Sequence, residues 1–330
     1  MTAPSPLDSA LDDLASGKRR RQAAGHEAIM QMAEGSAWKD ELVARLPELT
    51  SHPNPQVRGT AYLALATAQG EEALPILQAH LDEREGDARL DLAQGLAGIG
   101  APALGLLRRL VTDPIFEVRF AAAGGLVALG DPAAAEVLIE ALGHSDVRYL
   151  ALSALQRLAD PRALEPARRL LQKRFLSGYE RIAAAGVLAR LGDADARRWL
   201  VERVARRKGA DRGLAVEIVG ELGVGEALPA LLEALGDRKD PFRGACLRVL
   251  GMLGDQAHRE LIEKALFDTT EEVEVRMDAA EGLMNLGGPE ARAALERALG
   301  GTDDEELREV VSEAIAQLDL TKGDGQGGVE

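Results

Sequence analysis

Residues 113–142, DPIFEVRFAAAGGLVALGDPAAAEVLIEAL, contain the pattern that decides the fold of this chain. Apolar side chains follow Arg119 at helical spacing, on one face of a predicted helix: Ala122, Leu126 and Leu129. Gly130 suits the left-handed backbone that ends a helix, and Asp131-Pro132 suits the first turn of another. The stretch therefore predicts two helices joined by a short turn.

The same pattern recurs along most of the chain, and an arginine marks each copy. These marker arginines lie 29 to 33 residues apart: Arg58, Arg89, Arg119, Arg148, Arg181, Arg212, Arg243, Arg276 and Arg308. Leu, Val or Ile stands seven residues after each marker, and Leu, Ile or Ala stands ten residues after it. A period of this length, held at fixed offsets, is typical of stacked helical repeats.

This repeat resembles the HEAT-repeat family, in particular the short bacterial type first named after phycobilisome lyases. The resemblance covers about residues 53–318. It implies an all-α fold, namely an α-solenoid superhelix of about nine HEAT-like helix pairs. Members of the family include scaffolds, adaptors, a few DNA-binding enzymes and a metal-dependent hydroxylase, so the resemblance indicates the fold and leaves the activity open.

The sequence divides into four predicted segments. We expect a disordered N-terminus at 1–6, N-terminal capping helices at 7–52, the HEAT-like repeat solenoid at 53–320 and a flexible tail at 321–330. The capping helices are predicted near residues 7–15, 17–34 and 38–49, because the end of a solenoid needs an atypical outer face. Two joins between helices are longer than the others, at 172–179 and 267–274.

The composition favours a cytoplasmic protein. Cys246 is the single cysteine, which excludes an internal disulfide and fits a reducing compartment. The N-terminus lacks a basic segment followed by an apolar one, and no apolar run reaches the roughly 18 residues that span a membrane. We therefore predict no signal peptide and no membrane insertion. The richness in Ala, Leu and Arg favours a bacterial source.

No residue pattern indicates a catalytic site, a metal site or a cofactor. The five histidines occupy different repeat positions: His26, His52, His80, His144 and His258. A zinc or iron site needs several converging ligands. The hydroxylases of this family carry repeated His-Glu pairs, and here only His26-Glu27 occurs. Cys246 takes a position where other repeats have alanine, so we interpret it as a buried packing residue.

The marker arginines are interpreted as structural, because a residue that recurs in every repeat belongs to the scaffold. Their expected partners are carbonyl groups and carboxylates of neighbouring turns, with these acids as examples: Asp113, Asp131, Asp160 and Asp193. Gly124-Gly125, in the middle of a predicted helix, is interpreted as a point of close helix packing.

Charge is distributed unevenly along the chain, whose net charge is −15. Residues 157–212 hold 15 Lys and Arg against 7 Asp and Glu, a net charge of +8. Residues 255–330 hold 7 Lys and Arg against 20 Asp and Glu, a net charge of −13. The acidic end would bind a basic partner or another copy of the chain, or would solubilise the end of the solenoid.

The predicted binding residues, which we call the basic band, are Arg168, Arg169, Lys173, Arg174, Arg197, Arg198, Arg203, Arg206, Arg207 and Lys208. In HEAT-type stacks the second helix of each pair lines the concave surface, so we expect the band there. Trp199 lies among these residues, and Phe175 and Tyr179 lie close by in sequence. Such a cluster suits a phosphate backbone with stacked bases, an acidic protein partner, or no partner at all as a solvated face.

These observations predict a non-enzymatic scaffold or adaptor that binds a protein partner with an acidic or extended segment on its concave face. Two alternatives remain open. The basic middle would suit nucleic acid or another phosphate-rich ligand, and the fold alone is compatible with a lyase-like chromophore chaperone. No cofactor is expected, and the oligomeric state is left open.

Overall fold

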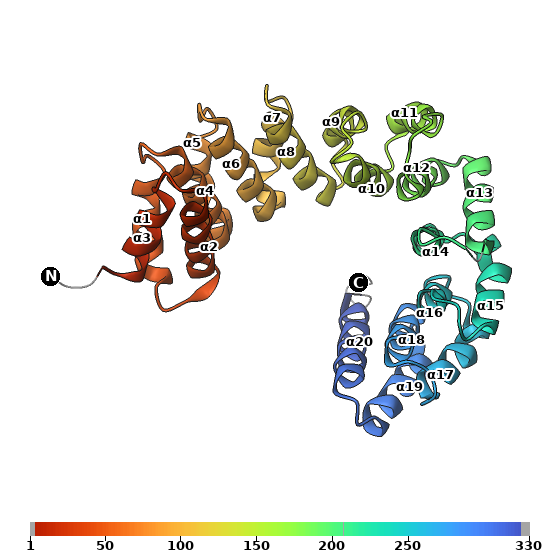
Figure 1. Cartoon of the computed structure of the whole chain (residues 1–330). Helices are drawn as coiled ribbons and strands as arrows, with labels where there is room; N and C mark the ends of the chain where they lie inside the picture. Colours follow the sequence, from red (N-terminus) through yellow and green to blue (C-terminus); the bar gives the residue numbers. More distant parts are fainter. Residues whose placement is uncertain (1–3, 207, 325–330) are drawn as a thin grey trace, which may run out of the picture. The chain divides into compact units, whose positions relative to one another are not determined.

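The computed structural model describes residues 4–206 and 208–324, with side chains up to residue 320. These residues form α-helices and short 3-10 helices and no strand, which confirms the all-α prediction. The chain divides into two compact units, unit 1 (Met1–Pro166) and unit 2 (Ala167–Glu330). Figure 1 shows each unit as a stack of helices. Across residues 4–206 and 208–324, none of the helices has the length and apolar character needed to span a membrane.

Unit 1 contains α1 (Pro6–Leu14), α2 (Arg19–Gly35), α3 (Lys39–Leu49), α4 (Pro55–Gln69), α5 (Leu74–Ala79), α6 (Gly86–Ile99), α7 (Leu104–Leu110), α8 (Phe116–Ala128), α9 (Ala135–Ala141) and α10 (Arg148–Leu158). The boundary between the units falls within α11 (Leu164–Leu171). Unit 2 continues with α12 (Gly178–Arg190), α13 (Ala194–Ala205), α14 (Arg212–Glu221), α15 (Leu228–Gly236), α16 (Arg243–Met252), α17 (Arg259–Phe267), α18 (Val273–Leu286), α19 (Gly288–Gly301) and α20 (Glu305–Asp324). The 3-10 helices are η1 (Gly70–Ala73), η2 (Ala101–Ala103), η3 (Pro132–Ala134), η4 (Pro161–Ala163), η5 (Gly225–Ala227) and η6 (Gln256–His258).

The repeats have the predicted form of helix pairs. Each marker arginine lies in the first helix of a pair, and these first helices are α4, α6, α8, α10, α12, α14, α16, α18 and α20. The second helices are α5, α7, α9, α11, α13, α15, α17 and α19. The apolar positions of the repeat form the core; Ala122 and Leu126, for example, have no exposed surface. Neither helix of a pair covers its apolar face alone, so the core is built by stacking.

The two ends of the chain differ from the sequence prediction in detail. The three capping helices α1, α2 and α3 lie where they were predicted, but α1 already begins at Pro6. The Ser5 side chain accepts a hydrogen bond from the Asp8 backbone N–H at 3.1 Å, so this part of the segment predicted as disordered caps a helix. At the other end, α20 continues to Asp324, into the predicted flexible tail. Residues 325–330 lie outside the described part of the chain.

The first helices end near a residue with left-handed backbone conformation, as the sequence predicted at Gly130. Where a second helix follows, the first or second residue after the first helix has positive φ, at Gly70, Gly100, Gly130, Ala159, Gly192, Gly223, Gly254 and Gly287. Ala159, with φ of 54°, is the only residue in this set that is not glycine. A Cβ atom is unfavourable in this conformation, and Gly carries none. The join after α10 is therefore less favourable than the others.

The marker arginines attach each first helix to the chain segment before it. Each guanidinium donates to a main-chain carbonyl at the end of the preceding helix or in the join after it: the carbonyls of His52, Glu83, Asp113, Leu142, Lys173, Val204, Leu235, Leu266 and Thr302. Carbonyls at a helix C-terminus have no partner within the helix, so the arginine satisfies groups that would otherwise need water. The structural interpretation of these arginines is confirmed.

At least five marker arginines also hold a carboxylate that lies further along the described chain. The pairs are Arg58–Glu83, Arg89–Asp113, Arg119–Glu140, Arg212–Asp240 and Arg243–Glu271, with N–O distances of 2.6 to 2.9 Å. Of the acids named from the sequence, only Asp113 pairs with a marker. Asp131, Asp160 and Asp193 pair instead with arginines of the second-helix segments, Arg108, Arg162 and Arg168. These three acids lie in the turn between the first and second helix of a pair, where each caps the helix that follows, whereas the acids held by markers lie at the end of a second helix or in the join after it.

The prediction that second helices line the concave side is wrong for unit 2. Figure 1 shows α14, α16 and α18 on the inner side of this stack and α13, α15 and α17 on its outer side. The reason lies in small residues of the first helices. A Cβ at Gly251 would overlap the main chain of Gly282, so α16 and α18 approach too closely for a larger side chain. In unit 1, a Cβ at Gly125 would lie 2.9 Å from the Cα of Ala97, which confirms close packing at this residue, whereas a Cβ at Gly124 would meet nothing within 4 Å, so the prediction is wrong for Gly124.

We expect Ala159→Gly to stabilise unit 1 by about 0.5–1 kcal/mol, because glycine adopts positive φ without the strain of a Cβ atom. The measurement is the free energy of unfolding in urea. Ala154→Gly, in the interior of α10, is the matched control and should destabilise by about 1 kcal/mol. A loss of stability in both variants would contradict the role given to this left-handed position.

Candidate functional site

Four residues of the basic band are engaged in ion pairs within the chain. The pairs are Arg168–Asp193 at 2.8 Å, Arg197–Glu226 at 3.3 Å, Arg198–Asp195 and Arg203–Asp211. Arg203 is the most buried of these cations, since its side chain is only 11% exposed. It also donates to the Lys208 carbonyl at 3.1 Å, and therefore holds the join between α13 and α14. Packing accounts for Arg203, and its charge is not open to a partner.

Five other residues of the band are exposed and have no ion pair within the described part of the chain. We call them the unpaired cations: Arg169, Lys173, Arg174, Arg206 and Lys208. Arg169 lies on α11, whereas the other four lie in the joins before α12 and α14. Arg207 lies outside the described residues. The available positive charge therefore lies mainly in two loops, not along two helices as the sequence suggested.

The join before α12 also exposes aromatic side chains. Phe175 is 91% exposed, and the Arg174 guanidinium lies 5.9 Å from the centre of its ring. Tyr179, in the first turn of α12, is 48% exposed. Leu176, between them, is buried and anchors the loop. An exposed aromatic ring among unpaired cations is typical of interaction surfaces.

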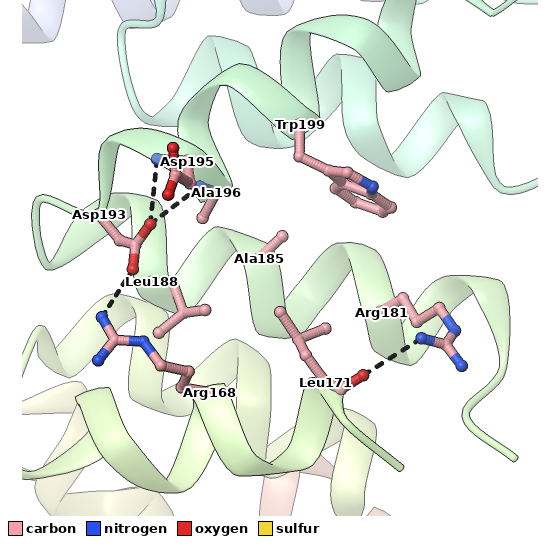
Figure 2. A pocket seen from close by; sticks show the side chains of 9 residues that line it. All are labelled: Arg168, Leu171, Arg181, Ala185, Leu188, Asp193, Asp195, Ala196 and Trp199. Carbon is pink, nitrogen blue, oxygen red and sulfur yellow. Dashed lines mark hydrogen bonds and ion pairs between the residues drawn. The ribbon is translucent and has the colours of Figure 1, made fainter. Parts of the chain in front are cut away.

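A groove lies in unit 2 between the second helices α11 and α13, with α12 as its floor (Figure 2). It has a volume of about 390 Å³, at the lower end of the range for ligand sites. Its lining residues are Arg168, Leu171, Arg181, Ala185, Leu188, Asp193, Asp195, Ala196 and Trp199. We call this space the second-helix groove. Its floor is apolar, and its polar groups lie at the two ends.

The two ends of the second-helix groove differ in charge. At one end Asp193 accepts from Arg168 at 2.8 Å and from the backbone N–H groups of Asp195 and Ala196 (Figure 2). The hydrogen bond from Arg168 lowers the pKa of the Asp193 carboxyl below its ordinary value, so this end is a fixed ion pair. At the opposite end, Arg181 donates to the carbonyls of Leu171 at 3.4 Å and Lys173 at 3.2 Å.

The sequence predicted only part of this groove. Arg168 is the residue of the basic band that lines it, and the half-buried Trp199 forms one wall. Arg181 was interpreted as a scaffold residue, and Ala185 and Leu188 are ordinary core positions of the repeat, so nothing in the periodicity distinguishes them. The one feature of the sequence that could have indicated the groove is the long join at 172–177, which separates α11 from α12.

The acidic end is partly structural. Glu263 pairs with Arg259 at 3.2 Å and with Arg297 at 3.0 Å. Glu271 pairs with Arg238 and Arg243 at 3.0 and 2.9 Å. In contrast, the exposed acids without an ion pair in the described chain lie mainly at the start of α20, among them Asp303, Glu305, Glu306 and Glu309. These acids form the matched control surface for the unpaired cations.

The residues with catalytic potential take part in packing. His26 meets the Thr60 hydroxyl at 2.9 Å, and the His144 ring stacks on Phe116 at 4.2 Å. The remaining histidines also make local contacts: His52 with the Asn54 N–H, His80 with the Tyr62 ring and His258 with Asp255. Cys246 is buried, and burial raises the pKa of its thiol to about 12. Within residues 4–206 and 208–320, His, Cys, Asp and Glu form no group of three or more suited to a metal ion.

Comparison with known proteins bears on the family and the fold. The family model for HEAT repeats matches residues 11–97, 81–147 and 228–316, which together make up more than half of the chain. No curated protein matches the sequence. Among solved structures, a chain of the Kap95:Nup1 complex is similar with a TM-score of 0.56 at 13% identity, over 96% of this chain and 52% of that one.

Two further solved structures are a lyase and a hydroxylase, which are protein classes that the sequence analysis considered. The complex of CpcE and CpcF of phycocyanin lyase from Nostoc sp. PCC7120 has a TM-score of 0.34 at 17% identity, over 96% of both chains. Human deoxyhypusine hydroxylase has a TM-score of 0.34 at 22% identity, over 78% of this chain and 99% of that one. At these identities the similarity concerns the fold alone.

For Cys246 we expect slow labelling by a thiol reagent in the folded protein and fast labelling in denaturant, because the thiol is buried and mostly protonated. Cys246→Ala should cost about 1 kcal/mol or less, since other repeats place alanine at this position. Labelling rates and urea unfolding measure the two effects. Equally fast labelling of the native and denatured protein would show that the site opens readily.

Proposed function

Because the chain belongs to the HEAT-repeat family, we propose that it is a non-enzymatic scaffold that binds a protein partner through the outer side of unit 2. The unpaired cations and the second-helix groove form the proposed contact surface, and the partner contributes an acidic, extended segment. The proposal moves the expected surface from the inner to the outer side of the stack, where the second helices lie.

The observation that carries the proposal is the imbalance of charge in unit 2. Many arginines of the chain are matched by a carboxylate, from the buried Arg212–Asp240 pair to the exposed Arg198–Asp195 pair. The unpaired cations lack such a match, although the chain as a whole has an excess of acids and a net charge of −15. Unmatched charge on an interaction surface steers association and selects a partner of opposite sign.

A protein segment fits this surface better than nucleic acid does. Binding of nucleic acid depends on many cations placed along a phosphate backbone. Here Arg168, Arg197 and Arg198 are already paired with acids, and Asp193 and Asp195 lie on the groove itself. Phosphate groups follow one another at a regular spacing along the backbone, so they could not avoid these carboxylates. An extended peptide can place its acids on the cations and an apolar side chain on the apolar floor.

The proposal of a non-enzymatic role rests on the engagement of the reactive side chains in packing, described above for the histidines and Cys246. A cytoplasmic location is part of the proposal, supported by the use of a single cysteine.

We expect partner binding to weaken by about tenfold or more when all the unpaired cations are replaced by glutamate. The replaced residues are Arg169, Lys173, Arg174, Arg206 and Lys208. The helical circular dichroism should stay unchanged, because these side chains are exposed. Residual binding should lose most of its salt dependence. The measurement is recovery of partners from a lysate at several salt concentrations, followed by titration of the recovered partner.

The matched control reverses five exposed acids of the acidic end to lysine: Asp303, Glu305, Glu306, Glu309 and Glu313. It should keep the partner. Loss of the partner from the control, with full binding by the cation variant, would place the surface at the wrong end of unit 2. A gel shift with DNA or RNA that disappears in the cation variant would favour the nucleic-acid alternative.

A further inference from the structure

Arg181 differs from five other marker arginines in what its guanidinium contacts. Like the others it donates to main-chain carbonyls, here those of Leu171 and Lys173. Arg58, for example, also holds Glu83 at 2.7 Å, in the join after the following second helix. In the described chain Arg181 has no such carboxylate. Arg276 also lacks one, but it does not line the second-helix groove.

Two positions after Arg181 correspond to positions that hold a carboxylate in other repeats. Glu202 lies where Glu140 follows Arg119, but it forms no ion pair with Arg181 in the described chain. Arg206 lies where Glu83 follows Arg58. The join from 206 to 211 contains one acid, Asp211, and Arg203 holds it. A cation therefore stands where another repeat supplies the carboxylate. The guanidinium of Arg181 is fixed by its carbonyl bonds and keeps further N–H donors for an acceptor from outside the chain.

The same guanidinium closes one end of an apolar space. Figure 2 shows Trp199 and Ala196 on one side of the second-helix groove, Leu171 and Leu188 on the other, and Arg181 at the end opposite to Asp193. The volume of about 390 Å³ suits one or two large side chains. Apolar walls with a single unmatched cation at one end define a ligand with one apolar group and a carboxylate next to it.

We infer that the second-helix groove binds a short segment of a protein partner in which a large aliphatic or aromatic side chain is followed closely by Asp or Glu. The apolar side chain packs against Trp199, Leu171 and Leu188. The carboxylate accepts from Arg181 and completes the contact that other repeats make within the chain. This inference rests on the proposed function, and it specifies the chemistry of the partner segment.

Charge and burial both favour this ligand over a free acidic tail. A bond between guanidinium and carboxylate is stronger than a bond between neutral groups, and its geometry is specific. Burial of one leucine side chain contributes about 1.5–3 kcal/mol, which corresponds to roughly tenfold to hundredfold in affinity. The unpaired cations Arg169, Lys173 and Arg206 add attraction for further acids of the segment.

Trp199 provides a direct reporter of groove occupancy. The chain has two tryptophans, and Trp38→Phe leaves Trp199 as the only one. The probe is a peptide of about twelve residues, rich in Glu, Gly and Ser, with one central leucine next to a glutamate. We expect the peptide to shift the emission of Trp199 to shorter wavelength, with a dissociation constant below about 1 mM. Replacement of the peptide leucine by alanine should weaken binding about tenfold.

Two substitutions in the protein test the two halves of the groove. Ala185→Met fills the apolar floor and should weaken binding about tenfold, and thermal melting checks that the variant folds. Arg206→Glu places a carboxylate at the position that Glu83 occupies relative to Arg58. This carboxylate should pair with Arg181 in competition with the peptide, and peptide affinity should again fall about tenfold. Arg206→Gln is the matched control. It removes the same cation without supplying an acid, and should lose only about twofold.

Loss of binding in Ala185→Met and Arg206→Glu, with little loss in Arg206→Gln, supports the inference. Absence of binding up to about 1 mM peptide, or binding that persists in both variants, overturns it. Equal losses in the two Arg206 variants also overturn it, because general electrostatic attraction would then suffice. The proposed function fails separately: reversal of Arg169, Lys173, Arg174 and Lys208, with Arg206 kept, would leave partner recovery unchanged even where the peptide binds in the groove.

Discussion

The contact between each marker arginine and a main-chain carbonyl of the preceding segment is the interaction on which the stack depends. A helix leaves its last carbonyl groups without a partner, and burial of such groups between two repeats would be unfavourable. The arginine satisfies them from the next repeat. In at least five repeats of the described chain the same guanidinium also holds an acid further along the chain, so a single side chain joins three consecutive segments. Arg212 and Asp240 show the extreme, with both side chains 1% exposed.

This use of arginine decides which charges are available for binding. A simple count over residues 157–212 gives an excess of eight positive charges, but Arg203 and Arg212 are consumed by packing. Of the unpaired cations, Arg169 lies on α11 and the other four lie in the joins before α12 and α14. Arg181 has both a structural and a binding role in this account. Its hydrogen bonds to carbonyls hold the stack, and its remaining N–H donors are open to a carboxylate of a partner. The scaffold and the proposed binding surface thus use the same chemistry.

The sequence predicted the repeat and its core because both depend on local periodicity. Leu126 and Gly130 have the burial and the left-handed backbone that their spacing from Arg119 indicated. The concave side was predicted wrongly, since the curvature of unit 2 depends on how closely α16 and α18 approach at Gly251 and Gly282, and that contact joins two repeats. The pairing of Arg168 with Asp193, and the division of the chain at Pro166, also depend on contacts that no spacing specifies.

Hydrogen exchange of an Arg119→Gln variant tests the central claim, that the arginines attach neighbouring segments locally. Arg119 donates to the carbonyls of Asp113 and Pro114 and to Glu140 on α9. Loss of these charge-assisted bonds, each worth about 1.5–3 kcal/mol, should speed exchange at least about tenfold in residues 111–116 and in α9. Amides of α4, two repeats away, should keep their rates. Faster exchange spread evenly over unit 1, or no change around Arg119, would contradict this account of the stack.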